Sequence, residues 1–231
     1  AFVRVSHAMV VFPGGVGTAE EILYLLGILL HPDNAAQPFP LILTGPRQSA
    51  EYFERIDAFL RLALGDAVAS RYQILVDSPQ QVARAVRKGT EQVREYRVAS
   101  QDAFFFNWGL TIDHALQQPF APTHENMAAL DLRLGQPPHQ LAAHLRRAFS
   151  GIVAGNVKED GLRAIEQRGP FEIRGEPSIM RALDELLAGK EIKTTETAVD
   201  GCLITLPTTP EVKRPVTFYQ DVLPIVQAAG I

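Results

Sequence analysis

Apolar residues in the first hundred positions fall into short continuous runs separated by longer stretches with helical spacing. These runs, at residues 8–12, 41–44 and 72–76, are each followed by turn residues. This pattern is typical of buried strands. Between and after these runs, apolar positions recur at three- and four-residue steps, which predicts helices beginning near residues 18, 49 and 78. Alternating strands and helices of this kind predict an α/β fold with a parallel sheet.

The pattern changes near residues 98–102, where we place a domain boundary between residues 1–100 and 101–231. Regular alternation gives way to the aromatic cluster Phe104–Trp108 and a proline-containing loop. Helices are expected from Thr123, over 138–157, 161–167 and 178–187, and weakly over 218–229, with strands at 171–174 and 202–206. The second unit is therefore expected to be a smaller α+β domain.

The first domain is expected to lack its upstream half in this sequence. Doubly wound, Rossmann-like sheets place strand–helix units on both sides of a ligand crevice, whereas this chain reaches its first glycine turn at residue 13. Residues 1–100 are then the C-terminal half of such a domain. We expect a parallel sheet with one uncovered strand edge, since the missing half would pair there.

The turn after the first strand has the composition of a phosphate site. Glycines let an anion approach the main chain, and the first N–H groups of a helix have no acceptor within it. Gly14, Gly15, Gly17 and Thr18 are the candidate phosphate ligands. No lysine follows the glycines, so this is not a Walker loop.

Two carboxylates, Glu20 and Glu21, follow the turn. Their presence needs an explanation, because a negatively charged carboxylate repels a phosphate bound nearby. One explanation is that they face another part of the ligand and act in catalysis. The other is structural. Thr18 and Glu21 have the spacing of a capping box, in which each side chain satisfies a backbone N–H at the start of a helix.

The stretch Pro13-Gly14-Gly15-x-Gly17-Thr18-x-x-Glu21 matches at every specified position the signature of the LOG (LONELY GUY) phosphoribohydrolases, often labelled lysine decarboxylases. Further stretches resemble one branch of that family, the bacterial pyrimidine/purine nucleotide 5′-monophosphate nucleosidases. They include residues 24–28, 106–108, 123–127 and 145–159. The resemblance extends from about residue 1 to residue 187.

This resemblance implies hydrolysis of the N-glycosidic bond of nucleoside 5′-monophosphates, without a metal or organic cofactor. Glu21 would stabilise the oxocarbenium-like centre and orient or deprotonate water, with Glu20 as a ribose ligand or second acid/base. Sites of this family also use an arginine that precedes the first strand. No residue here can be matched to it, and Arg4 lies too close to the strand for assignment.

Composition restricts the remaining function classes. A net charge of −4, with scattered arginines, gives no nucleic-acid footprint. The single Cys202 cannot form an internal disulfide, and the longest apolar helix candidate is too short to cross a bilayer, so we expect a cytoplasmic protein. The six histidines are expected to be isolated rather than metal ligands. No lysine follows a strand near the glycine turn, which disfavours a pyridoxal-type decarboxylase.

Two classes of function remain open: a nucleotide nucleosidase, and a non-catalytic module that binds nucleotides or mediates oligomer contacts. A cytokinin-activating phosphoribohydrolase differs only in the base, and we expect a homo-oligomer. Polar residues of the second domain either cap helices and cover surfaces or line the nucleotide site: His124, Glu125, Asn126, Arg146, Arg147, Asn156 and Lys158.

Overall fold

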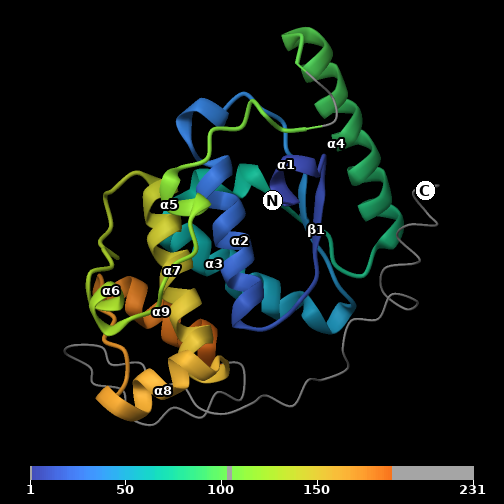
Figure 1. Cartoon of the computed structure of the whole chain (residues 1–231). Coiled ribbons are helices and arrows are strands. Elements are labelled where there is room, and N and C mark those ends of the chain that lie inside the picture. Colours follow the sequence, from blue (N-terminus) through green and yellow to red (C-terminus); the bar gives the residue numbers. More distant parts are fainter. Residues whose placement is uncertain (1, 103–105, 189–231) are drawn as a thin grey trace.

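A computed structural model describes residues 2–102 and 106–188, and places three parallel strands at the centre of the first hundred residues (Figure 1). Their order in the sheet is β1 (Met9–Val11), β2 (Leu41–Leu43) and β3 (Gln73–Ile74). Met9 pairs with Leu41, and Ile42 pairs with Gln73. The central strand β2 is buried throughout, whereas β1 at the edge is only partly buried. The expected parallel sheet is confirmed.

Helices cover both faces of this sheet because successive strand residues point to opposite sides. Val10 and Ile42 pack with Val82 of α4 (Pro79–Ser100). The alternate positions, Met9, Val11, Leu41 and Leu43, belong to the larger core that includes α2 (Val16–Leu29) and α3 (Ala50–Leu64). Figure 1 shows α4 on one side of the sheet and α2 on the other. The expected α/β class is confirmed.

Residues 106–188 form helices that pack against the first segment. They are α5 (His114–Gln117), α6 (His124–Ala128), α7 (Pro138–Val157), α8 (Glu159–Arg168) and α9 (Pro177–Ala188). The apolar face of α7 lies along α2, and α3 contacts both α7 and α9. Phe59 of α3 meets Phe149 of α7 with ring centroids 6.0 Å apart. Both segments therefore contribute to one hydrophobic core, and the domain boundary near residues 98–102 stays a prediction.

The expected helices from residues 18, 49, 78, 123, 138, 161 and 178 are confirmed, but the strand expected over 171–174 is wrong. Phe171 and Ile173 are buried, as the alternating pattern indicated. The segment nevertheless forms isolated bridges rather than a strand among the described residues, at Glu172 and between Leu132 and Gly175. The elements expected beyond residue 188 lie outside the described residues. No helix in the described ranges combines the length and apolarity needed to cross a membrane.

Polar side chains attach the chain after α4 to the first turn of the protein, α1 (Phe2–Val5). The Asn107 amide donates hydrogen bonds of 2.6 Å to the carbonyl oxygens of Val3 and Ser6. In return, the Arg4 guanidinium donates to the carbonyl oxygens of Asn107 at 2.6 Å and Leu110 at 2.8 Å. Arg4 therefore stabilises this junction, and its guanidinium is already occupied by backbone acceptors.

Candidate active site

The glycine turn lies between β1 and α2, at the carboxyl end of the sheet. Gly15 is the N-cap residue of α2, in an extended conformation and with no side-chain cap. Thr18 is the third helical residue, and its backbone N–H donates to the Gly15 carbonyl oxygen at 3.1 Å. The capping-box explanation for Thr18 and Glu21 is therefore wrong: α2 begins at Val16, three residues earlier than that explanation requires.

The three glycines of the turn have different surroundings. A Cβ atom on Gly14 would lie 2.0 Å from Thr18 Oγ1, so the fold itself requires glycine there. A Cβ on Gly15 or Gly17 would meet no atom within 4 Å. The space in front of these two residues is open. At the start of a helix, such a surface presents free N–H groups that suit an anion.

The loops that follow the three strands meet beside this turn. A Cβ on Gly45, after β2, would lie 2.8 Å from Pro13 Cδ, after β1. The backbone N–H of Asp77, after β3, donates to the Gly45 carbonyl oxygen at 2.9 Å. Ligands of parallel α/β sheets bind in a crevice at this end of the strands. The turn thus occupies the position in the fold where such a ligand is expected.

The side chain of Tyr52, on α3, lies next to the glycine turn, and the sequence did not indicate this contact. Its ring packs against Phe53, with centroids 5.0 Å apart, and its hydroxyl interacts with the backbone of Gly14. Burial raises the pKa of Tyr52 to about 12, and the Gly14 hydrogen bond offsets part of this effect. The hydroxyl therefore stays protonated at neutral pH, next to the first glycine of the turn.

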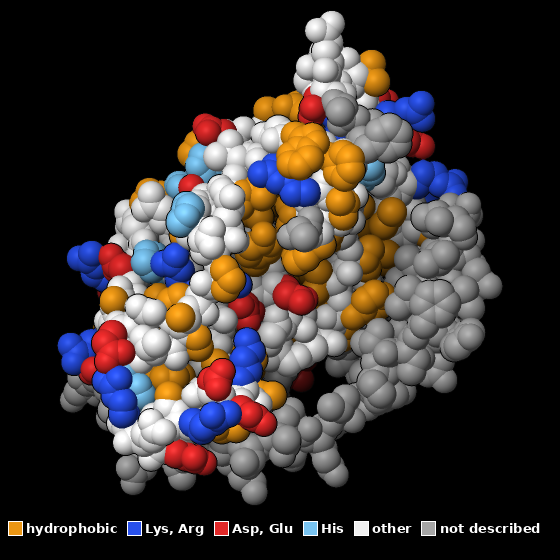
Figure 2. All heavy atoms as spheres, in the orientation of Figure 1, with side chains coloured by type: hydrophobic (Ala, Val, Ile, Leu, Met, Phe, Trp, Pro, Cys, Tyr) orange, Lys and Arg blue, Asp and Glu red, His pale blue; other side chains and the backbone are white. Residues whose placement is uncertain are grey.

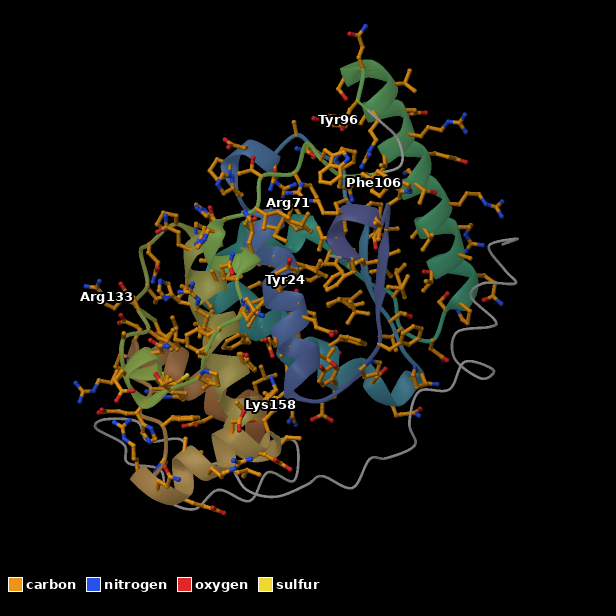
Figure 3. All side chains as sticks on the ribbon, in the orientation of Figure 1. Tyr24, Arg71, Tyr96, Phe106, Arg133 and Lys158 are labelled. Carbon is orange, nitrogen blue, oxygen red and sulfur yellow. The ribbon has the colours of Figure 1, made fainter. Side chains whose placement is uncertain are left out.

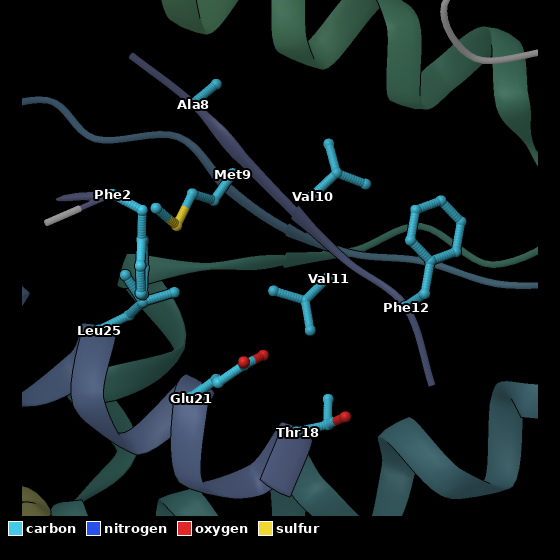
Figure 4. Close-up of a pocket in the computed structure, with 9 residues that line it drawn as sticks. All are labelled: Phe2, Ala8, Met9, Val10, Val11, Phe12, Thr18, Glu21 and Leu25. Carbon is cyan, nitrogen blue, oxygen red and sulfur yellow. The ribbon is translucent and has the colours of Figure 1, made fainter. Parts of the chain in front are cut away.

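A cavity of about 410 Å³ opens along the edge strand β1. Its walls are apolar side chains of β1, together with Phe2 and Leu25, and only Thr18 and Glu21 contribute hydroxyl or carboxylate groups (Figure 4). Figure 2 shows hydrophobic side chains gathered along the hollowed face of the molecule. The hydroxyl and the carboxylate, three residues apart on α2, face the same space, as a site with a phosphate loop and an acidic group requires.

Glu20 faces a different neighbour from Glu21. Its Oε1 lies 3.3 Å from Nε of Arg146 on α7, and the side chains of both residues are more than 80% buried. Glu20 is absent from the cavity wall, whereas Glu21 is exposed to solvent there. The adjacent positions on the helix are about 100° apart, which separates the two carboxylates. The structure thus assigns them different environments.

Arg146 is the residue of the second segment that reaches this region. Its guanidinium lies 5.6 Å from the ring centroid of Tyr24, within the range of a cation–π contact. Figure 3 labels Tyr24 on α2. Its Nε and Nη1 atoms are buried, and neither makes a hydrogen bond with the described residues. Such donors are costly to bury without an acceptor, and the Glu20 carboxylate is the nearest compensating charge.

The other polar residues singled out in the second segment make local contacts. Arg147 lies 5.7 Å from the Phe120 ring, and Glu125 pairs with Arg168 at 2.7 Å. Side chains of three more bond to nearby backbone carbonyl oxygens: His124 with Gly169, Asn126 with Ala121, and Asn156 with Ile152. Lys158 is exposed at the junction of α7 and α8. These contacts favour the structural interpretation for all of them except Arg146.

The expectation that all six histidines are isolated is wrong. His31, just after α2, and His139, at the start of α7, have ring centroids 4.9 Å apart, and both face Asp113. These residues lie far apart in sequence and on separate elements, so no spacing motif could have revealed them. They are the group among the described residues whose ligand atoms are close enough to hold a metal ion.

Comparison with known proteins shows which proteins this chain resembles. Residues 1–86 match the family model described as "Possible lysine decarboxylase", and residues 90–195 match "Pyrimidine/purine nucleotide monophosphate nucleosidase, C-terminal". The chain is 55% identical, over 189 residues, to the "Pyrimidine/purine nucleotide 5′-monophosphate nucleosidase" of Escherichia coli strain K12 and to that of strain O157:H7. The chain is thus similar to pyrimidine/purine nucleotide monophosphate nucleosidases over most of its own length. Its resemblance to this nucleosidase family, first seen in the glycine motif, is confirmed.

The match covers 82% of this chain but 42% of each nucleosidase relative. This chain therefore represents less than half the length of the relatives that it resembles. The boundary between the two matched segments falls at residues 86–90, inside α4. The glycine turn belongs to the first segment, and Arg146 belongs to the nucleosidase-specific second one.

Proposed function

We propose that this chain supplies the phosphate loop and a catalytic carboxylate of an enzyme that hydrolyses nucleoside 5′-monophosphates to free base and ribose 5-phosphate. The observation that carries the proposal is the shared cavity of Thr18 and Glu21 beside the open glycine turn. The activity for which the nucleosidase relatives are named supports the same reaction. No step of the proposed hydrolysis requires a cofactor.

In this proposal the 5′-phosphate binds at the start of α2. Backbone N–H groups of Gly14, Gly15, Gly17 and Thr18, with the Thr18 hydroxyl, are the proposed ligands, and the positive end of the helix dipole favours the anion. The Gly14 backbone also contacts Tyr52. We therefore assign the larger share of phosphate binding to Gly15 and Gly17, whose front faces are open.

Glu21, one helical turn into α2, would then face C1′ of the ribose. As the C1′–N bond breaks, positive charge develops at C1′, and a carboxylate stabilises it while orienting water. The water oxygen bonds to C1′, and its proton is transferred by way of Glu21 or solvent to the departing base. The apolar wall of the cavity strengthens the interaction because it excludes bulk water.

Glu20 has a supporting role in this scheme. Its ion pair with Arg146 fixes the carboxylate against α7, which favours a ribose-hydroxyl ligand over a second acid/base. Arg146 would thereby connect the second segment to the catalytic one. We retain residues 1–100 and 101–231 as the proposed domains, with α7 as the element that completes the site.

Further properties are proposed from the family resemblance. They are a cytoplasmic location, assembly as a homo-oligomer, participation in purine and pyrimidine salvage, and the Rossmann-like LOG architecture of the nucleotide domain. A non-catalytic nucleotide-binding or oligomerisation module, and a cytokinin-activating phosphoribohydrolase, remain the alternatives. Substrate assays distinguish all three, because a module releases no base and a cytokinin-activating enzyme prefers a modified adenine.

The test is release of free base from AMP, GMP, CMP and adenosine by a protein that contains this chain together with the remainder of its relatives' length. We expect turnover of the monophosphates and little turnover of adenosine, because binding energy at the phosphate positions C1′ for attack. Equal rates on AMP and adenosine would refute the phosphate site. No base release from any monophosphate would favour the non-catalytic module.

A further inference from the structure

Three polar side chains converge on one point at the far end of α2 from the glycine turn. His31 follows α2, Asp113 precedes α5, and His139 lies in the first turn of α7. One ligand atom of each residue lies within 4.8 Å of the other two. Since α2 has 14 residues, at about 1.5 Å each, this cluster is roughly 20 Å from the glycine turn. It is therefore separate from the proposed nucleotide site.

The distances between these ligand atoms are longer than a hydrogen bond and close to the distance between two ligand atoms of one metal ion. His31 Nε2 lies 3.5 Å from Asp113 Oδ1, and His139 Nε2 lies 3.9 Å from Asp113 Oδ2. A good N–H···O bond spans about 2.7–3.2 Å. In a tetrahedral zinc site with bonds near 2.0–2.1 Å, neighbouring ligand atoms are about 3.4 Å apart. Small side-chain rotations would bring this cluster to that spacing.

The surroundings of the two imidazoles also suit a metal. The His139 ring is buried, with 9% of the residue exposed, so a metal ion there would be largely shielded from bulk water. The Nδ1 atom of His31 lies 3.8 Å from a carboxylate oxygen of Asp33. When a metal binds Nε2, the proton moves to Nδ1, and a carboxylate there orients the ring. The present contact of Nδ1 with the Asp33 backbone N–H, at 3.3 Å, is long and would cost little to lose.

We propose that His31, Asp113 and His139 form a binding site for a divalent transition-metal ion, with Zn²⁺ as the best match. Two imidazoles and one carboxylate are ligands that zinc accepts, and a water molecule would complete the tetrahedron. The Asp33 and Asp113 carboxylates balance the charge of the ion. Because the ligands come from three elements, the ion would connect the end of α2 to the segment that precedes α5 and to α7.

A neighbouring buried amide shows that this corner is already well ordered. The Asn34 side chain is fully buried and donates 2.7 Å hydrogen bonds to the carbonyl oxygens of Ile28 and Thr111. Its Oδ1 accepts a 2.8 Å bond from the Thr111 N–H. The backbones that carry His31 and Asp113 are thus joined independently of any ion. Preorganised ligands lose less conformational freedom when they bind an ion, which favours metal binding by these three residues.

The test is calorimetric titration with Zn²⁺ near pH 7.5 of the protein with its full nucleotide domain, in a Cys202→Ser background so that this thiol does not contribute. We expect one site whose affinity falls at least about tenfold in His31→Gln and in Asp113→Asn. Asp33→Asn should weaken binding less. Zn²⁺ should also raise the melting temperature of the parent chain and leave that of His31→Gln unchanged.

His114→Gln is the matched control, because His114 is exposed and adjacent to Asp113 but is not part of the cluster. It should bind Zn²⁺ like the parent chain. Melting curves without metal identify any variant that fails to fold. If His31→Gln fails to fold, Asp113→Asn, which keeps the side-chain shape, provides the comparison with the parent chain. Absence of binding at about 100 μM Zn²⁺, or equal affinity in the parent chain and both ligand variants, would overturn the proposal.

Discussion

Replacing Glu21 by glutamine separates catalysis from folding more sharply than any other substitution in this chain. The side chain keeps its size but loses the charge that would face C1′. Glu21 is exposed on the cavity wall and makes no ion pair with the described residues. Such surface changes usually alter the free energy of unfolding by less than about 0.5 kcal/mol. Because Gly15, and not Thr18, is the N-cap residue of α2, the substitution removes no capping contact either.

The effect on turnover follows from Coulomb's law. A unit charge about 4 Å from a developing positive centre contributes roughly 1 kcal/mol in bulk water and about 4 kcal/mol at an effective dielectric constant of 20. Bound substrate and the apolar wall displace water from this cavity, so the value should lie toward the upper end. At 1.36 kcal/mol per tenfold change in rate, about 3 kcal/mol corresponds to a loss of roughly a hundredfold or more.

Thermal melting and base release from AMP, measured on the protein with its full nucleotide domain, check both halves of this prediction. Glu21→Gln should melt with the wild type and show the large loss in turnover. Glu20→Gln should lose less activity. It should melt earlier, because Arg146 then keeps buried donors without their compensating charge. If turnover of Glu21→Gln stays within a factor of a few of wild type, the catalytic assignment fails.

Three further changes test the surroundings of the site. Arg146→Gln should lower turnover by freeing Glu20, whereas Arg147→Gln, the adjacent control that packs on another ring, should leave KM and kcat near wild type. Gly17→Ala should stabilise the fold by about 0.5–1 kcal/mol, as in other helices, yet raise KM for AMP, because its Cβ enters the open phosphate space. Gly14→Ala should instead lower the melting temperature, since its Cβ would lie 2.0 Å from Thr18 Oγ1.

Most of the fold could be predicted because the signals are local. Continuous apolar runs followed by turn residues located β1, β2 and β3, and the helices between them implied parallel pairing. Pro79 and Pro138 each mark the first residue of a helix, as their fixed backbone angle predicts. The strand expected over 171–174 failed because alternation reports burial and cannot supply a partner strand.

The candidate site was predictable only in part, for a related reason. The motif identified Thr18 and Glu21, and the structure brings both to one cavity. It could not indicate that Glu20, the next residue, turns toward α7, because that depends on a partner 126 positions away, Arg146. The His31–Asp113–His139 cluster escaped notice likewise, since its members are separated by more than 25 residues each and share no spacing.

These long-range contacts bear on why the nucleosidase-specific segment accompanies a phosphate loop that the wider family shares. In this chain α7 packs along α2, with Arg146 against Glu20 near one end and His139 against His31 at the other. A change in the position of α7 would therefore move Glu20 without touching the glycine turn. In the proposed scheme, phosphate binding and ribose positioning depend on different segments, so substitutions on α7 should alter kcat for the monophosphates more than their affinity.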